Sequence, residues 1–155
     1  MKRLSIAIII LVIIYSSCTK DDSQITLSSA ADFYKYCSTN NNNSCGELLN
    51  HEGQYISMIG YVNANNVKRF YNFFTLFDSP SVDFNNGLNV GVNNDSTAIF
   101  NKLISNLDTV HILNFTKIKV IGRIWGSNVL YVNEGCKRLP EFSVDNSKDI
   151  FITGK

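Results

Sequence analysis

Short runs in which hydrophobic and polar residues alternate predict a mainly β protein. We expect three strands at residues 54–62, 69–78 and 88–92, and two more at 117–125 and 128–133. Gly126 and Ser127 separate the last two runs and predict a tight turn between them. The pattern therefore favours a small sheet of five strands.

Two segments change from this alternation to helical spacing. Residues 96–107 carry apolar side chains three and four positions apart behind Asp95 or Ser96, either of which can cap a helix. This helix would connect the third strand to the fourth. Residues 27–49 predict an N-terminal helical extension: a short helix capped by Ser28 or Ser29, an asparagine-rich turn, and a second helical turn ending near residue 49.

Two of the predicted strands share a pattern that places a glycine inside each of them. The sequences are "ISMIGYV" from Ile56, with Gly60, and "IKVIGRI" from Ile118, with Gly122. A glycine weakens a strand unless the strand bends or another backbone approaches closely. Together with "FFTLFD" at 73–78, these motifs resemble OB-fold domains of the anticodon-binding and related nucleic-acid-binding superfamily. The resemblance covers roughly residues 48–133 and implies a five-stranded Greek-key barrel with a helix between strands three and four.

The alternation also assigns the two faces of the strands. The positions expected inside the barrel are Ile56, Met58, Gly60, Val62, Phe74, Leu76, Leu88, Val90, Val92, Ile118, Val120, Gly122 and Ile124. The side chains expected outside, on the face where OB-folds usually bind ligands, are Tyr61, Tyr71, Phe73, Thr75 and Phe77. Exposed aromatic rings stack well on sugars or bases.

Lys68 and Arg69 lie beside these outward aromatic residues and could bind a phosphate or a carboxylate. The candidate ligand-binding residues are therefore Tyr61, Lys68, Arg69, Tyr71, Phe73 and Phe77. A second interpretation remains open at this stage. The N-terminal helix, or the loop after Asp78, would cover the aromatic face and form a second small core with it.

The N-terminus has the pattern of a secretory signal. Lys2 and Arg3 precede an apolar run at 4–14, which is shorter than the ~20 residues that a membrane-spanning helix needs. The next residues, "YSSC", resemble the lipobox of bacterial lipoproteins, although Tyr15 stands where leucine or valine is usual. This resemblance implies cleavage after residue 17 and a lipid on Cys18. We expect a signal peptide at 1–17, a linker at 18–26 and one domain at 27–155; the alternatives are a buried N-terminal strand or an anchor helix.

Acyl chains on Cys18 would hold the domain at a membrane. Thr19, Lys20, Asp21 and Asp22 resemble the signal that sends some lipoproteins to the outer face of the outer membrane. We therefore expect display on the cell surface in preference to the periplasmic face, and a solvated linker start is the alternative interpretation of these four residues.

Charge bears on the choice of partner. The chain has 14 basic and 13 acidic residues, and without Lys2 and Arg3 the remaining 12 basic residues nearly balance the acidic ones. Proteins that bind nucleic acid draw on an excess of Lys and Arg that contacts phosphates. The near-neutral domain therefore disfavours nucleic acid as the partner.

Three cysteines remain after the lipobox, and an exported protein is expected to form a disulfide. Cys37–Cys45 is the predicted pair because the loop between them is short and flexible. Cys136 competes for either partner, and one thiol stays free. The cysteines have no CxxC spacing, and His51 and His111 are distant from them in the sequence, so we expect no metal site.

The sequence contains no catalytic motif of the common kinds: no G-x-S-x-G, no H-E-x-x-H and no phosphate-binding glycine loop. We therefore expect a lipid-anchored, non-catalytic envelope module, without a cofactor, that binds a protein or a saccharide. The alternatives are an oligonucleotide-binding OB-fold protein and a structural accessory subunit of a surface complex.

Overall fold

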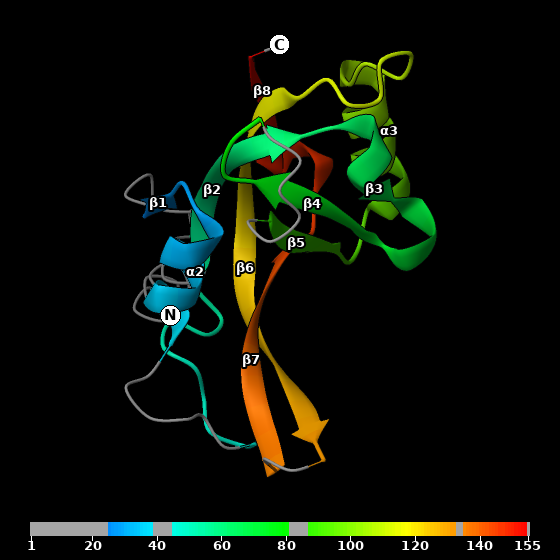
Figure 1. Ribbon diagram of the computed structural model, residues 1–155. Helices are drawn as coiled ribbons and strands as arrows, with labels where there is room; N and C mark the ends of the chain where they lie inside the picture. Colours follow the sequence, from blue (N-terminus) through cyan, green and yellow to red (C-terminus); the bar gives the residue numbers. More distant parts are fainter. Residues whose placement is uncertain (1–24, 39–44, 81–86, 133–134, 155) are drawn as a thin grey trace, which may run out of the picture.

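The computed structural model describes residues 25–38, 45–80, 87–132 and 135–154. This part of the chain is mainly β, with two α-helices and a mixed eight-stranded sheet (Figure 1). The helices are α2 (Ala30–Cys37) and α3 (Ser96–Asn106). The strands are β1 (Thr26–Leu27), β2 (Tyr55–Val62), β3 (Val67–Lys68), β4 (Phe73–Phe77), β5 (Gly87–Val92), β6 (Thr116–Tyr131), β7 (Gly135–Val144) and β8 (Ile150–Gly154).

The sheet curls round on itself. The strands follow the order β2-β4-β5-β7-β6, and β6 returns to pair with β2 from Tyr55↔Arg123 to Val62↔Thr116. The β5–β7 pair is parallel, whereas the other pairs of this ring are antiparallel. The ring is not a regular barrel, because β2 and β4 share a single register pair, Tyr61↔Phe77. The prediction of a mainly β fold with helices is confirmed, whereas the predicted five-stranded Greek-key barrel is not confirmed.

Close backbone approach explains the two glycines inside β2 and β6. A Cβ atom at Gly60 would lie 2.7 Å from the carbonyl oxygen of Phe77, and a Cβ atom at Gly122 would overlap the carbonyl oxygen of Ser143. Both contacts would be far closer than ordinary van der Waals contact. Any larger residue at either position would push neighbouring strands apart, as expected for a glycine inside a strand.

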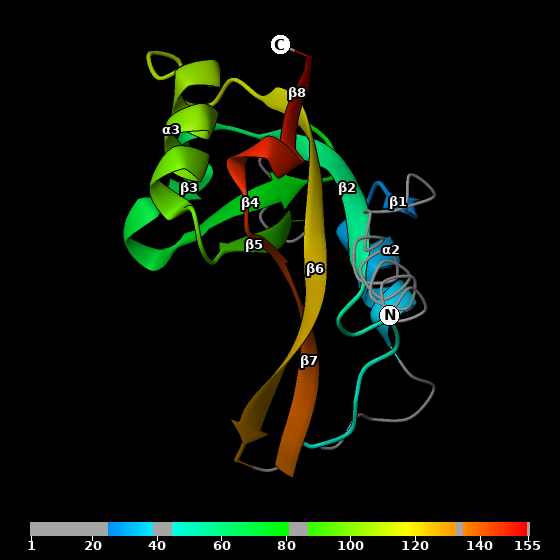
Figure 2. The ribbon, with the colours of Figure 1, turned by 180° about the vertical axis from the view of Figure 1, so that it is seen from behind.

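The side chains predicted to point inward form the centre of the hydrophobic core. All eleven non-glycine positions of that set are buried. The helix α3 adds Ile99, Phe100 and Leu103 to this core, and α2 adds Phe33. Figures 1 and 2 show α3 at one end of the sheet and α2 along its side, beside β2. Both helices therefore pack on the sheet through one apolar face.

The start of α2 follows its prediction closely. Ser29 caps the helix, and its hydroxyl accepts a hydrogen bond of 2.9 Å from the backbone N–H of Asp32. The backbone N–H of Ala30 donates to the carboxylate of Asp78 at 2.8 Å. Asp78 follows directly on β4, so this bond ties the N-terminal extension to the sheet.

Three sequence predictions are wrong about the elements themselves. Gly126 and Ser127 form no turn, because β6 runs through them to Tyr131. Residues 69–71 form a 3-10 helix, η2 (Arg69–Tyr71), and β4 begins only at Phe73. Residues 45–49 contain no helical turn. The predicted lipobox, including Cys18, lies outside the described residues, as does nearly all of the linker predicted at 18–26.

The second half of β6 and the first half of β7 extend beyond the ring as a two-stranded ribbon (Figures 1 and 2). We call this ribbon the hairpin arm; it comprises residues 126–131 and 135–140. Its register runs from Gly126↔Pro140 to Tyr131↔Gly135. Among the helices in the described ranges, none has the length and apolar character required to cross a membrane.

Candidate functional site

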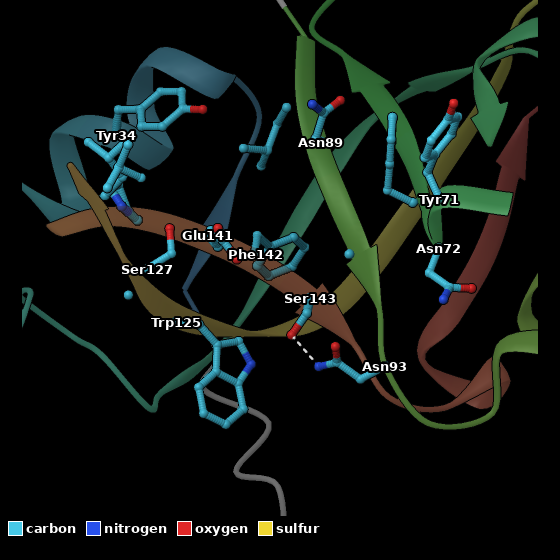
Figure 3. A pocket seen from close by; sticks show the side chains of 17 residues that line it. Tyr34, Tyr71, Asn72, Asn89, Asn93, Trp125, Ser127, Glu141, Phe142 and Ser143 are labelled. Atoms are coloured by element: carbon cyan, nitrogen blue, oxygen red, sulfur yellow. Dashed lines mark hydrogen bonds between the residues drawn. The ribbon is translucent and has the colours of Figure 1, made fainter. Parts of the chain in front are cut away.

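A groove of about 870 Å³ lies between the outer face of β4 and β5 and the hairpin arm. Its aromatic lining comes from five separate elements: Tyr34 from α2, Tyr71 from η2, Phe73 from β4, Trp125 from β6 and Phe142 from β7. Figure 3 shows Tyr34 and Tyr71 on opposite sides of the view, with Glu141 and Ser143 between them. Segments far apart in the sequence thus build one concave surface.

Strand register explains the floor of this groove. Phe73 pairs with Gly91, Gly91 pairs with Ser143, and these residues form one row across β4, β5 and β7. Gly91 contributes no side chain to the row, which leaves the floor low at its middle. The amide of Asn93 donates to the hydroxyl of Ser143 at 3.0 Å and to the carboxylate of Asp145 at 3.2 Å (Figure 3). These bonds fix the polar end of the floor.

The polar lining consists mainly of amides and hydroxyls. It includes Asn72, Asn89, Asn93, Ser127 and Ser143. Glu141 is the one Asp, Glu, Lys or Arg among the described residues that line the groove. The site is therefore rich in neutral hydrogen-bonding groups and carries a single negative charge.

Trp125 is held in place from one side. The guanidinium carbon of Arg123 lies 4.1 Å from the centroid of its ring, which is a cation–π contact. Arg123 does not line the groove, whereas Trp125 does and remains 37% exposed. An indole with one face occupied and a fixed orientation is suited to stack on a flat apolar ligand surface.

Tyr34 contributes a neutral hydroxyl to the opposite wall. Burial raises the pKa of Tyr34 above its usual value, and the nearby Cys37 and Glu141 raise it further. The phenol therefore stays protonated at neutral pH and can both donate and accept a hydrogen bond.

A disulfide fastens the hairpin arm to the segment that precedes β2. Cys45 is bonded to Cys136, and their Cα atoms lie 5.3 Å apart, which is within the usual range for this separation. The predicted Cys37–Cys45 pair is therefore wrong. Cys37 is a buried free thiol because it lies on the face of α2 that packs into the core. The predicted single free thiol is this one.

An ion pair makes a second attachment between the same two segments. Arg138 on β7 binds Glu52 through two of its nitrogens, and its Nε lies 3.0 Å from a carboxylate oxygen. The hydrogen bond from Arg138 is the main reason that the pKa of Glu52 is lowered. A Cβ atom at Gly126 would overlap the guanidinium of Arg138, so this glycine makes room for the ion pair.

The structure brings two of the six predicted ligand-binding residues to the groove. Tyr71, which is 70% exposed, and Phe73 both line it. Phe77 is not accessible to a ligand: it is 2% exposed, and the ring of Phe115 packs against it with centroids 5.7 Å apart. The prediction for Phe77 is wrong because a loop residue distant in sequence covers this part of the outer face.

The other three predicted residues lie away from the groove. Tyr61 is half-buried and has the ammonium of Lys117 5.8 Å from its ring centroid. Lys68 donates to the backbone carbonyl of Asn65 at 2.8 Å, and Arg69 donates to the side chain of Asn101 at 2.7 Å. These two cations are thus used within the fold and are not among the residues that line the groove.

Sequence reasoning missed Tyr34, Trp125 and Glu141. Glu141 lies on β7, whose sequence has no clear alternation that predicts a strand. For Trp125, the sequence predicts only the end of a strand, next to a turn at Gly126 and Ser127. One signal was present: Trp125 is the only tryptophan of the chain, and it precedes Gly126 on a strand otherwise rich in aliphatic residues.

Among the residues described here, no three His, Cys, Asp or Glu side chains converge in a way that could hold a metal ion. Comparison of the chain with protein-family models, with curated proteins and with solved structures finds no match.

Proposed function

We propose that this protein is a non-catalytic binding module that holds a saccharide in the groove. The lining of the groove carries the proposal: aromatic rings and neutral amides and hydroxyls together line a hollow of about 870 Å³. Aromatic faces stack on the apolar faces of sugar rings, and neutral amides and hydroxyls bond to sugar hydroxyls. The volume is within the usual range for small-ligand sites, which favours an oligosaccharide over a protein surface.

The charge of the groove disfavours an oligonucleotide. A strand of nucleic acid requires Lys or Arg along its phosphates. The groove lining that the structure describes contains neither residue, and its single charge, Glu141, would repel a phosphate.

The strand order supports the further proposal that the ring is a distorted OB-fold. β2, β4, β5, β6 and β7 follow the expected order, with a parallel β5–β7 pair and α3 between β5 and β6. OB-folds bind oligonucleotides and oligosaccharides on the face of their second and third strands and on the loops beside it. The groove occupies the corresponding surface, between β4 and β5 and the hairpin arm.

We expect Tyr71→Ala to weaken oligosaccharide binding by about tenfold, because a stacked ring contributes on the order of 1 kcal/mol beyond its buried area. Tyr71 is largely exposed, so the change leaves the core intact. Binding is measured through the fluorescence of Trp125, the only tryptophan, with hexasaccharides of glucosamine and of N-acetylglucosamine as the first probes. Phe70→Ala is the matched control, because Phe70 is also a largely exposed aromatic residue of η2 but does not line the groove. Equal affinities for Tyr71→Ala and wild type would contradict the proposal.

The envelope location is part of the same proposal and rests on the lipobox-like "YSSC". We expect Cys18→Ser to release the protein from membranes into the soluble fraction, since no acyl chain can then be attached. Protease treatment of intact cells tests which side carries the domain. Degradation in intact cells supports surface display, whereas degradation only after envelope rupture places the domain on the periplasmic face.

A further inference from the structure

Glu141 places a carboxylate in the groove without a cationic partner among the described residues. It lies on β7 directly opposite Trp125 in the strand register, and its side chain is exposed. The structure gives it neither an ion pair nor a hydrogen bond within the described ranges. Its carboxylate is therefore available to a ligand, at the point where the groove meets the hairpin arm (Figure 3).

Aromatic rings flank this carboxylate. Trp125 is its cross-strand neighbour, and such neighbours have Cβ atoms roughly 5 Å apart. Tyr34 is close enough for the charge of Glu141 to act on its hydroxyl. Aromatic faces attract cations, and a carboxylate beside them adds a full opposite charge. The combination is suited to a positively charged group.

The cations near the groove are engaged elsewhere. Arg123 stacks on Trp125, Lys137 lies 5.4 Å from the ring centroid of Tyr131, and Arg138 is paired with Glu52. None of them lines the groove. Within the described part of the chain, no cation that lines the groove faces Glu141, which leaves this carboxylate open to a positive charge on a ligand.

We propose that the saccharide held in the groove is an amino sugar, whose protonated amine binds between the carboxylate of Glu141 and the rings of Trp125 and Tyr34. This inference rests on the proposed function and names its substrate class. The remaining hydroxyls of the sugar bond to the amides along the floor. The amine fixes the orientation of the ligand, because Glu141 is the single charged residue among the described lining of the groove.

The test compares two hexasaccharides that differ in this group alone: the glucosamine oligomer, protonated at about pH 6, and the N-acetylglucosamine oligomer, which is neutral. We expect the wild type to bind the amine form about tenfold more tightly at low salt, measured by Trp125 fluorescence. Glu141→Gln should lower the affinity for the amine form about tenfold and so remove this preference. Asp95→Asn is the matched control: it also removes one exposed carboxylate, but at the start of α3, outside the groove.

The outcomes separate the two proposals. If both oligomers bind equally to the wild type, the amino-sugar inference is overturned while the saccharide function stands. If neither oligomer binds, nor any neutral oligosaccharide, the proposed function falls and the inference with it. A tri-lysine peptide serves as the third arm. Tighter binding of this peptide than of the glucosamine oligomer, with the same loss in Glu141→Gln, would assign the amine to a peptide and overturn the sugar.

Discussion

Reduction of the Cys45–Cys136 disulfide is expected to lower the free energy of unfolding by about 2–5 kcal/mol. The bond closes a long loop, with 91 residues of sequence separation, so its loss frees a large part of the unfolded chain. The Cys45→Ser/Cys136→Ser variant should reproduce the effect without a reductant. Urea unfolding followed by far-UV circular dichroism measures the difference.

The free thiol gives this experiment an internal check. Burial raises the pKa of the Cys37 thiol to about 12, so it should resist alkylation in the folded protein and react only after unfolding. Non-reducing peptide mapping should then find residues 45 and 136 linked and residue 37 alkylated. A Cys37–Cys45 peptide would contradict the structure. An unfolding midpoint that is the same for oxidised and reduced protein would contradict the expected stabilisation.

Replacement of Phe33 by alanine is expected to destabilise the fold by about 3–5 kcal/mol. Phe33 is fully buried, and its ring meets that of Phe142 at a centroid distance of 5.9 Å. The change leaves a cavity between α2 and the sheet. Because the backbone N–H of Ala30 also donates a hydrogen bond to Asp78, we expect α2 and the sheet to unfold together in one transition.

Phe70→Ala is the matched control for this variant. It removes the same side chain from a site that is 90% exposed, and we expect a change of less than about 0.5 kcal/mol. Hydrogen exchange shows whether α2 unfolds together with the sheet or separately from it. If Phe33→Ala leaves the sheet fully protected while the amides of α2 exchange freely, the helix is a separate attachment and not part of the cooperative core.

The buried half of the fold could be predicted from the sequence because its signals are local. Alternation in β2, β4, β5 and the first half of β6 identified the inward side chains, and the period change identified α3. These predictions depend on neighbours two to four residues away. The N-cap of α2 at Ser29 is also a local signal, since its hydroxyl accepts a hydrogen bond from the backbone N–H of Asp32, three residues later.

The groove could not be predicted in the same way because its walls depend on distant contacts. Gly126 resembles a turn residue in the sequence, but in the structure it makes room for the guanidinium of Arg138, twelve positions away. Pro140 argues against a strand, yet it pairs with Gly126 in the hairpin arm. Phe77 alternates correctly and is nevertheless covered, because Phe115 packs on it. In each case the deciding neighbour lies in another element.

The continuity of β6 has a consequence for how tightly the groove can hold a ligand. One unbroken strand of 16 residues belongs to the ring at its start and to the hairpin arm at its end. The disulfide and the Arg138–Glu52 pair restrain the arm from the side of the preceding segment. A wall built in this way has few alternative positions to lose when a ligand arrives, so little conformational entropy opposes binding. Under the proposed function, the arm would be a rigid wall of the groove, and the selectivity of binding would come from a shape that exists before the ligand binds.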